Sequence, residues 1–135
     1  MSGLKLLNNA LRDATNICLH HDTYRTDQSG RLIYFHLRPI FDTSSVTTHL
    51  FLDNTPLQEG LSGDVEKYPL GSNLLLQGRT LTICTIVTSI TPSTAQYSFA
   101  VRLEGGLHPH MFRMEKRMVL REDPFLHKMT IRFLR

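Results

Sequence analysis

The sequence predicts a mainly β protein, folded as an antiparallel β-sandwich with one or two short helices. Short segments alternate apolar and polar side chains, as strands with one buried and one solvated face do. Turn compositions rich in Pro, Gly, Asn, Asp and Ser separate these segments. The strand–helix alternation of a parallel sheet is missing, and so are the glycine fingerprints of dinucleotide and phosphate loops. A small Greek-key barrel is the alternative architecture.

The chain has the size of one ordinary domain. Splitting 135 residues would leave two cores too small to be stable, so we expect a single β-rich domain over residues 1–135. An apolar fraction of 41% and a charged fraction of 20% exclude a disordered composition.

The N-terminal half predicts a helix and then strands. Apolar residues at helical spacing predict a short helix over residues 3–12, followed by a first strand that ends near His20. Ile33, Phe35 and Leu37 then occupy one face of a second strand, and Pro39 indicates a sheet edge or a strand end. Residues 45–52 alternate again and are a hairpin candidate with that strand.

Residues 53–72 form the longest stretch that we expect to be irregular. Two prolines, three glycines and several turn compositions favour a loop, and long loops inside compact domains are often partner-facing. We therefore place a contact surface here. Residues 74–77 are expected to be a short strand or a bend.

Residues 79–106 predict a hairpin of two long strands joined by a turn at residues 91–94. The second strand alternates, with Val101 and Leu103 apolar beside Arg102 and Glu104. The first is apolar on both faces, so we expect it to be covered on both sides, by the same chain or by another subunit. Residues 111–120 fit either a helix or a strand, and residues 128–133 predict a final strand.

The charge of the chain is unevenly distributed. Residues 1–112 contain eight Lys and Arg against nine Asp and Glu, whereas residues 113–135 contain seven against three. No apolar segment has the length of a signal peptide or a membrane span, so we expect a cytoplasmic protein. In that compartment Cys18 and Cys84 are expected to be reduced, with a disulfide between two sheets as the alternative.

Catalytic patterns are weak. His108 and His110 are candidate zinc ligands, because two histidines one residue apart point the same way on a strand, but no third ligand is evident. Cys18 lies two residues from His20 without an orienting partner, and no GxSxG elbow occurs. We therefore expect no enzymatic activity and no cofactor, and keep a His-dependent metalloenzyme as a further alternative.

The sequence best fits a non-enzymatic protein–protein interaction module. We expect a structural subunit or adaptor of a larger assembly, of phage-like or secretion type, or a small inhibitor or immunity protein that binds a protein or self-associates. The candidate contact residues are Asn54, Glu59, Asp64, Glu66, Tyr34, Arg38, Arg113, Arg117 and Arg121.

A single-stranded nucleic-acid-binding β-barrel is the alternative from another class. It would use Tyr34, His36 and Arg38 on the solvated face of one strand, together with the basic residues after position 112.

Overall fold

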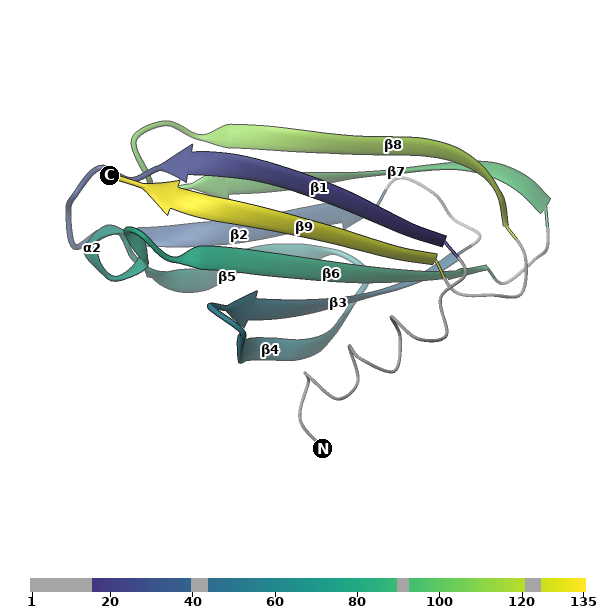
Figure 1. Cartoon of the computed structure of the whole chain (residues 1–135), viewed down its shortest axis with the longest axis horizontal. Coiled ribbons are helices and arrows are strands. Elements are labelled where there is room, and N and C mark those ends of the chain that lie inside the picture. The colour runs from purple at the N-terminus through teal and green to yellow at the C-terminus, as the bar shows by residue number, and fades with distance from the viewer. Residues whose placement is uncertain (1–15, 40–43, 90–92, 121–124) are drawn as a thin grey trace.

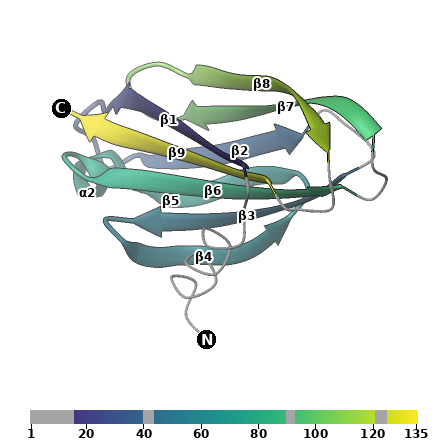
Figure 2. The same ribbon diagram turned by 45° about the vertical axis from the view of Figure 1, so that its right-hand side comes forward.

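The chain folds as a sandwich of two facing β-sheets (Figures 1 and 2). The computed structural model describes residues 16–39, 44–89, 93–120 and 125–135, which contain nine strands and one short helix. This confirms the predicted mainly β sandwich. No helix among the described residues is long and apolar enough to cross a lipid bilayer.

The strands divide into a five-stranded and a four-stranded sheet. The five-stranded sheet has the order β1 (Asn16–Arg25), β9 (Phe125–Leu134), β6 (Thr80–Ser89), β3 (Ser44–Leu52), β4 (Thr55–Ser62). The four-stranded sheet has the order β5 (Val65–Ser72), β2 (Leu32–Pro39), β7 (Ser93–Glu104), β8 (His110–Leu120). Neighbouring strands are antiparallel except for the parallel pair β1 and β9.

The prediction that residues 79–106 form a hairpin is wrong, and so is the predicted hairpin between the strands before and after Pro39. β6 and β7 lie in different sheets, and so do β2 and β3. The sequential neighbours that do pair are β3 with β4 and β7 with β8. Alternation determines which face of a strand is buried, but a strand of either sheet can supply the opposing face, so the pattern does not identify the hydrogen-bonded partner.

Residues 53–72 are not a loop, because they form β4 and β5, which are edge strands. Pro56 and Pro69 lie in these strands, and an edge strand tolerates a missing backbone donor. Gly60 lies within β4 at a φ of 69°, in a region where the register against β3 shifts. Glycine and proline here mark bulges and edges of a sheet.

The turn between β3 and β4 consists of Asp53 and Asn54, both with positive φ, as a two-residue hairpin turn requires. Asp53 also accepts hydrogen bonds from the Arg79 side chain and the Thr80 amide, which joins this hairpin to the start of β6.

Other predicted elements are confirmed or changed. Residues 111–120 are strand, within β8, and the final strand is β9. Residues 74–77 are not a strand, since α2 (Asn73–Leu76) is a single helical turn capped by the Ser72 hydroxyl. Pro39 ends β2, but β2 is a central strand flanked by β5 and β7. The helix expected over residues 3–12 lies outside the described residues.

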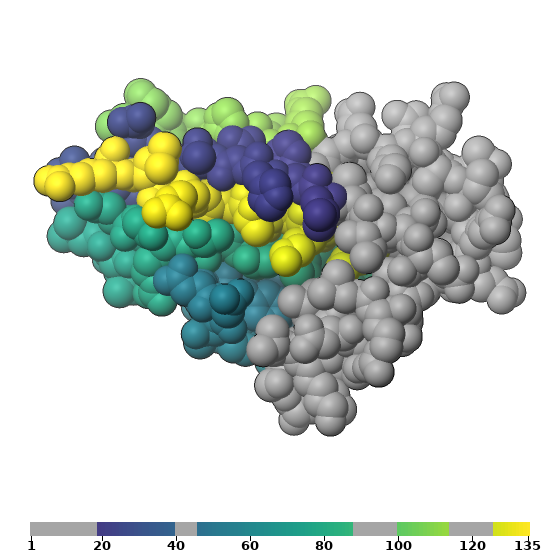
Figure 3. All heavy atoms as spheres, viewed as in Figure 1, coloured from purple at the N-terminus to yellow at the C-terminus, as the bar shows by residue number. Residues whose placement is uncertain are grey.

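The core lies between the two sheets. β2 contributes Ile33, Phe35 and Leu37, which are at most 1% exposed. β6 is apolar on both sides, as predicted, because Leu81 and Ile83 join the main core while Cys84 packs with Phe51 and Leu126 on the other face. The outer side of the five-stranded sheet faces the viewer in Figure 3. Cys84 is fully buried within one chain, so its burial requires no second subunit.

The two cysteines are too far apart for a disulfide. They lie on β1 and β6, and β9 runs between these strands. Two strand spacings separate their backbones by about 10 Å, whereas a disulfide needs Cα atoms within about 7 Å. Burial raises the pKa of the Cys84 thiol to about 11, so this group stays protonated and unreactive at neutral pH.

One end of the sandwich is closed by the buried side chain of Asn73. Its amide nitrogen donates to the carbonyls of Arg31 and Gly105, and its oxygen accepts from the Asp27 amide, all at 2.8–2.9 Å. These bonds tie the connection between β1 and β2 to the connection between β7 and β8. The C-terminus lies at this end, next to α2 (Figure 1).

Replacing Asn73 should therefore weaken the whole fold. We expect Asn73→Ala to lower the free energy of unfolding by about 3 kcal/mol, because it leaves the Asp27 amide without its acceptor and removes one of two donors from each of the two carbonyls. Chemical denaturation measures this loss, with the exposed Gln58→Ala as a control within about 0.5 kcal/mol of wild type. A loss below about 1 kcal/mol would contradict the role of Asn73.

Two buried hydroxyls face each other inside the five-stranded sheet. Thr48 and Thr85 are paired in the register of β3 and β6, both are fully buried, and neither hydroxyl has a hydrogen-bond partner among the described residues. A buried polar group without a partner costs free energy relative to its hydration in the unfolded chain.

We therefore expect Thr85→Val to stabilise the protein by about 1 kcal/mol, since valine keeps the shape and removes the unpaired hydroxyl. Thermal and chemical unfolding measure the change. The control is Thr82→Val, on the other face of β6 and partly exposed. Destabilisation by Thr85→Val would show that the hydroxyl is satisfied in solution.

Candidate functional site

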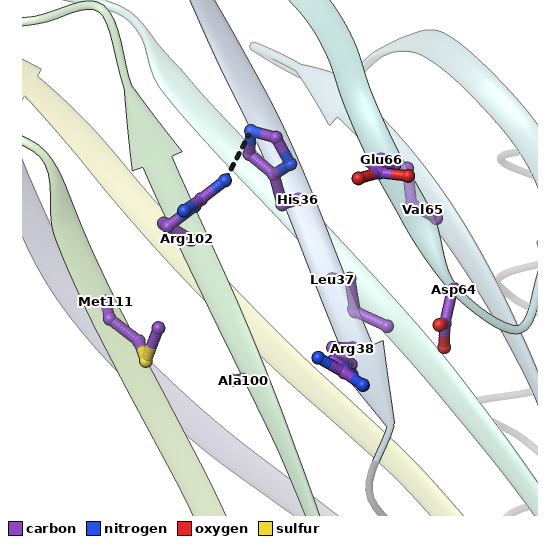
Figure 4. Close-up of a pocket in the computed structure, with 9 residues that line it drawn as sticks. All are labelled: His36, Leu37, Arg38, Asp64, Val65, Glu66, Ala100, Arg102 and Met111. Atoms are coloured by element: carbon purple, nitrogen blue, oxygen red, sulfur yellow. Dashed lines mark hydrogen bonds between the residues drawn. The ribbon is translucent and has the colours of Figure 1, made fainter.

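A polar cavity of about 440 Å³ opens on the outer face of the four-stranded sheet (Figure 4). Residues from β2, β7 and β8 and from the start of β5 surround it, and two of them, Leu37 and Val65, belong to the buried core. The lining residues are His36, Leu37, Arg38, Asp64, Val65, Glu66, Ala100, Arg102 and Met111.

Strand alternation places these side chains on the outer face. Because Phe35 and Leu37 point into the core, His36 and Arg38 on the same strand point outward. On β7, Val101 is buried in the same way, which turns its neighbours outward. The register then puts Arg102 beside His36, and Ala100 between Arg38 and Arg113.

His36 is the organising residue of this face. Its Nδ1 accepts a hydrogen bond from the Lys67 amide at 3.1 Å, so its Nε2 carries the proton and donates to Glu104 Oε1 at 2.7 Å. The ring is only 9% exposed. A side chain of β2 thus bonds to both neighbouring strands, β5 and β7.

A β-bulge creates the position of the Lys67 amide. The register of β2 against β5 shifts between Phe35 and Leu37, and Lys67 has a φ of 50°, in the left-handed region. Bulges re-aim backbone and side chains next to functional sites. Here the bulge directs the Lys67 amide toward the imidazole of His36. The Lys67 ammonium lies 5.9 Å from the centre of the Tyr34 ring.

The carboxylate of Glu104 is held in its charged form. Its hydrogen bond from His36 is the main cause that lowers the pKa of Glu104 below the ordinary value of 4.5. The positive charge of the Arg102 guanidinium, 4.0 Å from the carboxylate, also lowers the pKa of Glu104. The same guanidinium lies 3.4 Å from His36 Nε2, the contact that Figure 4 marks.

This geometry gives His36 a positioning function. A general base or a metal ligand needs a free imidazole nitrogen, and here one nitrogen accepts from an amide while the other donates to a carboxylate. The ring therefore fixes the strands that carry the cavity.

Four charged side chains in or beside the cavity have no ion-pair partner within the described part of the chain. Arg38, Arg113, Asp64 and Glu66 are all exposed, and none forms an ion pair with another described residue. The acidic pair comes from the β5 side and Arg38 from β2, as Figure 4 shows, while Arg113 follows from β8. The two ends of this row of charges are therefore acidic beside β5 and basic on β8, while Lys67 of β5 and Glu104 of β7 add charges of the opposite sign to the same face.

The structure brings together part of the predicted contact set. Tyr34, Arg38 and Arg113 share the outer face with Asp64 and Glu66.

Other members of the set lie elsewhere. Asn54 is in the turn that precedes β4, and Glu59 lies on β4, both in the five-stranded sheet. There Glu59 faces the buried His49, whose pKa is lowered chiefly by burial. Arg117 belongs to β8 but its side chain lies outside the described part of the structure, and Arg121 lies outside the described residues altogether.

The contact set omitted Arg102, Glu104, Ala100 and Met111, which complete the site. The alternation of β7 carries the signal for the first two, since it puts both on the face opposite Val101. Their proximity to Arg38 depends on the pairing of β2 with β7, residues that are about 65 positions apart.

The two candidate zinc ligands do not form a metal centre within the part of the chain that the structure describes. His110 begins β8 and stacks edge-on against Phe112, with 4.4 Å between the ring centres. No group of three or more His, Cys, Asp or Glu side chains among the described residues is arranged to share a metal ion.

Comparison of the chain with models of protein families, with curated proteins and with solved structures finds no match.

The His36–Glu104 bond makes a pH-dependent prediction. Because the folded pKa of Glu104 lies below 4.5, the pair stabilises the fold above that pH and loses this effect as the pH falls through the folded pKa. We expect His36→Leu to raise the pKa of Glu104 toward 4.5, as measured by NMR titration of the glutamate carboxyl carbons. Met111→Leu should leave that titration unchanged. The same Glu104 titration in wild type and His36→Leu would contradict the assignment.

Proposed function

We propose that this protein is a non-enzymatic protein–protein interaction module that acts as a structural subunit or adaptor of a larger assembly. Its binding surface is the outer face of the four-stranded sheet, around the cavity between Arg38, Asp64 and Arg102. A subunit of a phage-like or secretion-type complex and a small inhibitor or immunity protein are both compatible with this function.

The observation that supports the proposal is the set of four exposed charges of both signs that lack partners within the described residues. A protein surface carries both signs of charge and can compensate all four at once. Electrostatic complementarity of this kind gives an interface its orientation and its specificity.

The charge pattern favours a protein over a nucleic acid. Asp64, Glu66 and Glu104 lie among the cations of this face and would repel a phosphate backbone. The basic segment after residue 112 is also divided, because β8 belongs to the four-stranded sheet while β9, with Arg132, belongs to the other.

A capture experiment tests the proposal. The wild-type protein, the double variant Arg38→Glu/Arg113→Glu and the matched control Arg132→Glu/Arg135→Glu are each immobilised on a support. Each is then incubated with a lysate of the protein's native source. We expect one protein partner to be retained by the wild type and the control, lost from the Arg38/Arg113 variant, and released by about 0.5 M salt. Equal capture by all three baits, or no capture, would contradict the proposal.

The nucleic-acid alternative has its own measurement. We expect fluorescence anisotropy of a labelled single-stranded oligonucleotide to show no binding at low salt. Binding that weakens steeply with salt and disappears in Arg38→Glu/Arg113→Glu would instead assign this face to nucleic acid.

A further inference from the structure

One row of side chains crosses the whole outer face of the four-stranded sheet. Arg38 pairs with Ala100, and Ala100 pairs with Arg113 on the next strand. On the other side, Val65 pairs with Leu37, so in this antiparallel pair Asp64 lies opposite Arg38. The row therefore reads Asp64, Arg38, Ala100, Arg113 from β5 to β8, and we call it the charged row.

The two ends of the charged row are complementary to each other. A rotation of 180° about an axis parallel to the strands, between β2 and β7, places β5 of one copy over β8 of another and β2 over β7. Asp64 then faces Arg113 of the second copy at both ends of the row. At its centre Arg38 faces Ala100 of the second copy, so a long side chain meets the smallest side chain of the row.

We propose that the partner bound by this face is a second copy of the same chain, in a two-fold symmetric, face-to-face dimer. The inference rests on the proposed function and names its partner. A symmetric interface must carry complementary features on one surface, and the charged row meets that condition. Each copy supplies the charges that the other lacks, for Arg113 and for Asp64 with its neighbour Glu66.

The size and the polarity of the face indicate a weak dimer. Four strands at about 4.8 Å and eight residues at about 3.3 Å cover about 500 Å² on each copy. The dimer would bury about 1,000 Å² in total, which is at the lower end for specific interfaces. The face is also mostly polar, with Leu32, Tyr34 and Met111 as its larger apolar groups. The dimer should therefore depend on concentration and weaken with salt.

Sedimentation velocity of the full chain, from about 10 µM to about 1 mM, tests the dimer. The wild type should pass from monomer to dimer over this range. Arg38→Glu/Arg113→Glu makes the row acidic throughout, and Asp64→Lys/Glu66→Lys makes the β5 side basic, so each variant alone repels its own copy. Each should dissociate with a constant at least about 100-fold higher than that of the wild type.

Mixing the two variants gives the decisive result. An acidic face and a basic face are complementary, so an equimolar mixture should restore a dimer that contains one chain of each. The control Arg132→Glu/Arg135→Glu changes the same number of charges on residues outside this face and should dimerise like the wild type.

A wild type that stays monomeric at about 1 mM would overturn the dimer. A dimer that survives in both variants, or a mixture that stays monomeric, would overturn it too. In each case the capture experiment still decides whether another protein binds this face, so the two proposals fail separately.

Discussion

The imidazole of His36 joins three strands of the four-stranded sheet from its outer face. It accepts the Lys67 amide of β5 and donates to Glu104 of β7, and so uses both nitrogens to fix the strands on either side of its own. The pairing of Arg38 with Ala100, two residues further along these strands, follows from the same register of β2 against β7. The spacing of charges across the face therefore depends on a nearly buried ring and on the bulge at Lys67 that supplies its hydrogen-bond donor.

The burial pattern could be predicted from the sequence, whereas the pairing of strands could not. Phe35 and Leu37 are buried, and β6 is covered on both faces, as their apolar spacing predicts. That spacing is the same whether a strand pairs with its sequential neighbour or faces it across the core, so it led to two hairpins that do not exist. Pro56 and Pro69 favoured a loop in the sequence, but an edge strand also accepts proline. Whether a strand lies at an edge is known only from the assembled sheet.

For the candidate site too, the exposed faces could be predicted from the sequence and the strand pairing could not. Alternation alone puts Arg38 and Arg102 on solvated faces of their strands. Their proximity follows from the pairing of β2 with β7, and the position of Asp64 follows from the pairing of β2 with β5. Both pairings join residues that are distant along the chain, and local patterns carry no information about them. His36 illustrates the limit most clearly, since its function depends on an amide 31 residues away.

In the proposed dimer, a second copy of this chain binds to the outer face of the four-stranded sheet. Amide chemical shifts recorded by NMR from dilute to concentrated solution test it most directly. We expect concentration-dependent shifts at Arg38, Glu66, Ala100 and Arg113, with amides of β3, β4 and β6 unchanged. Shifts confined to the five-stranded sheet, or none at any concentration, would contradict it.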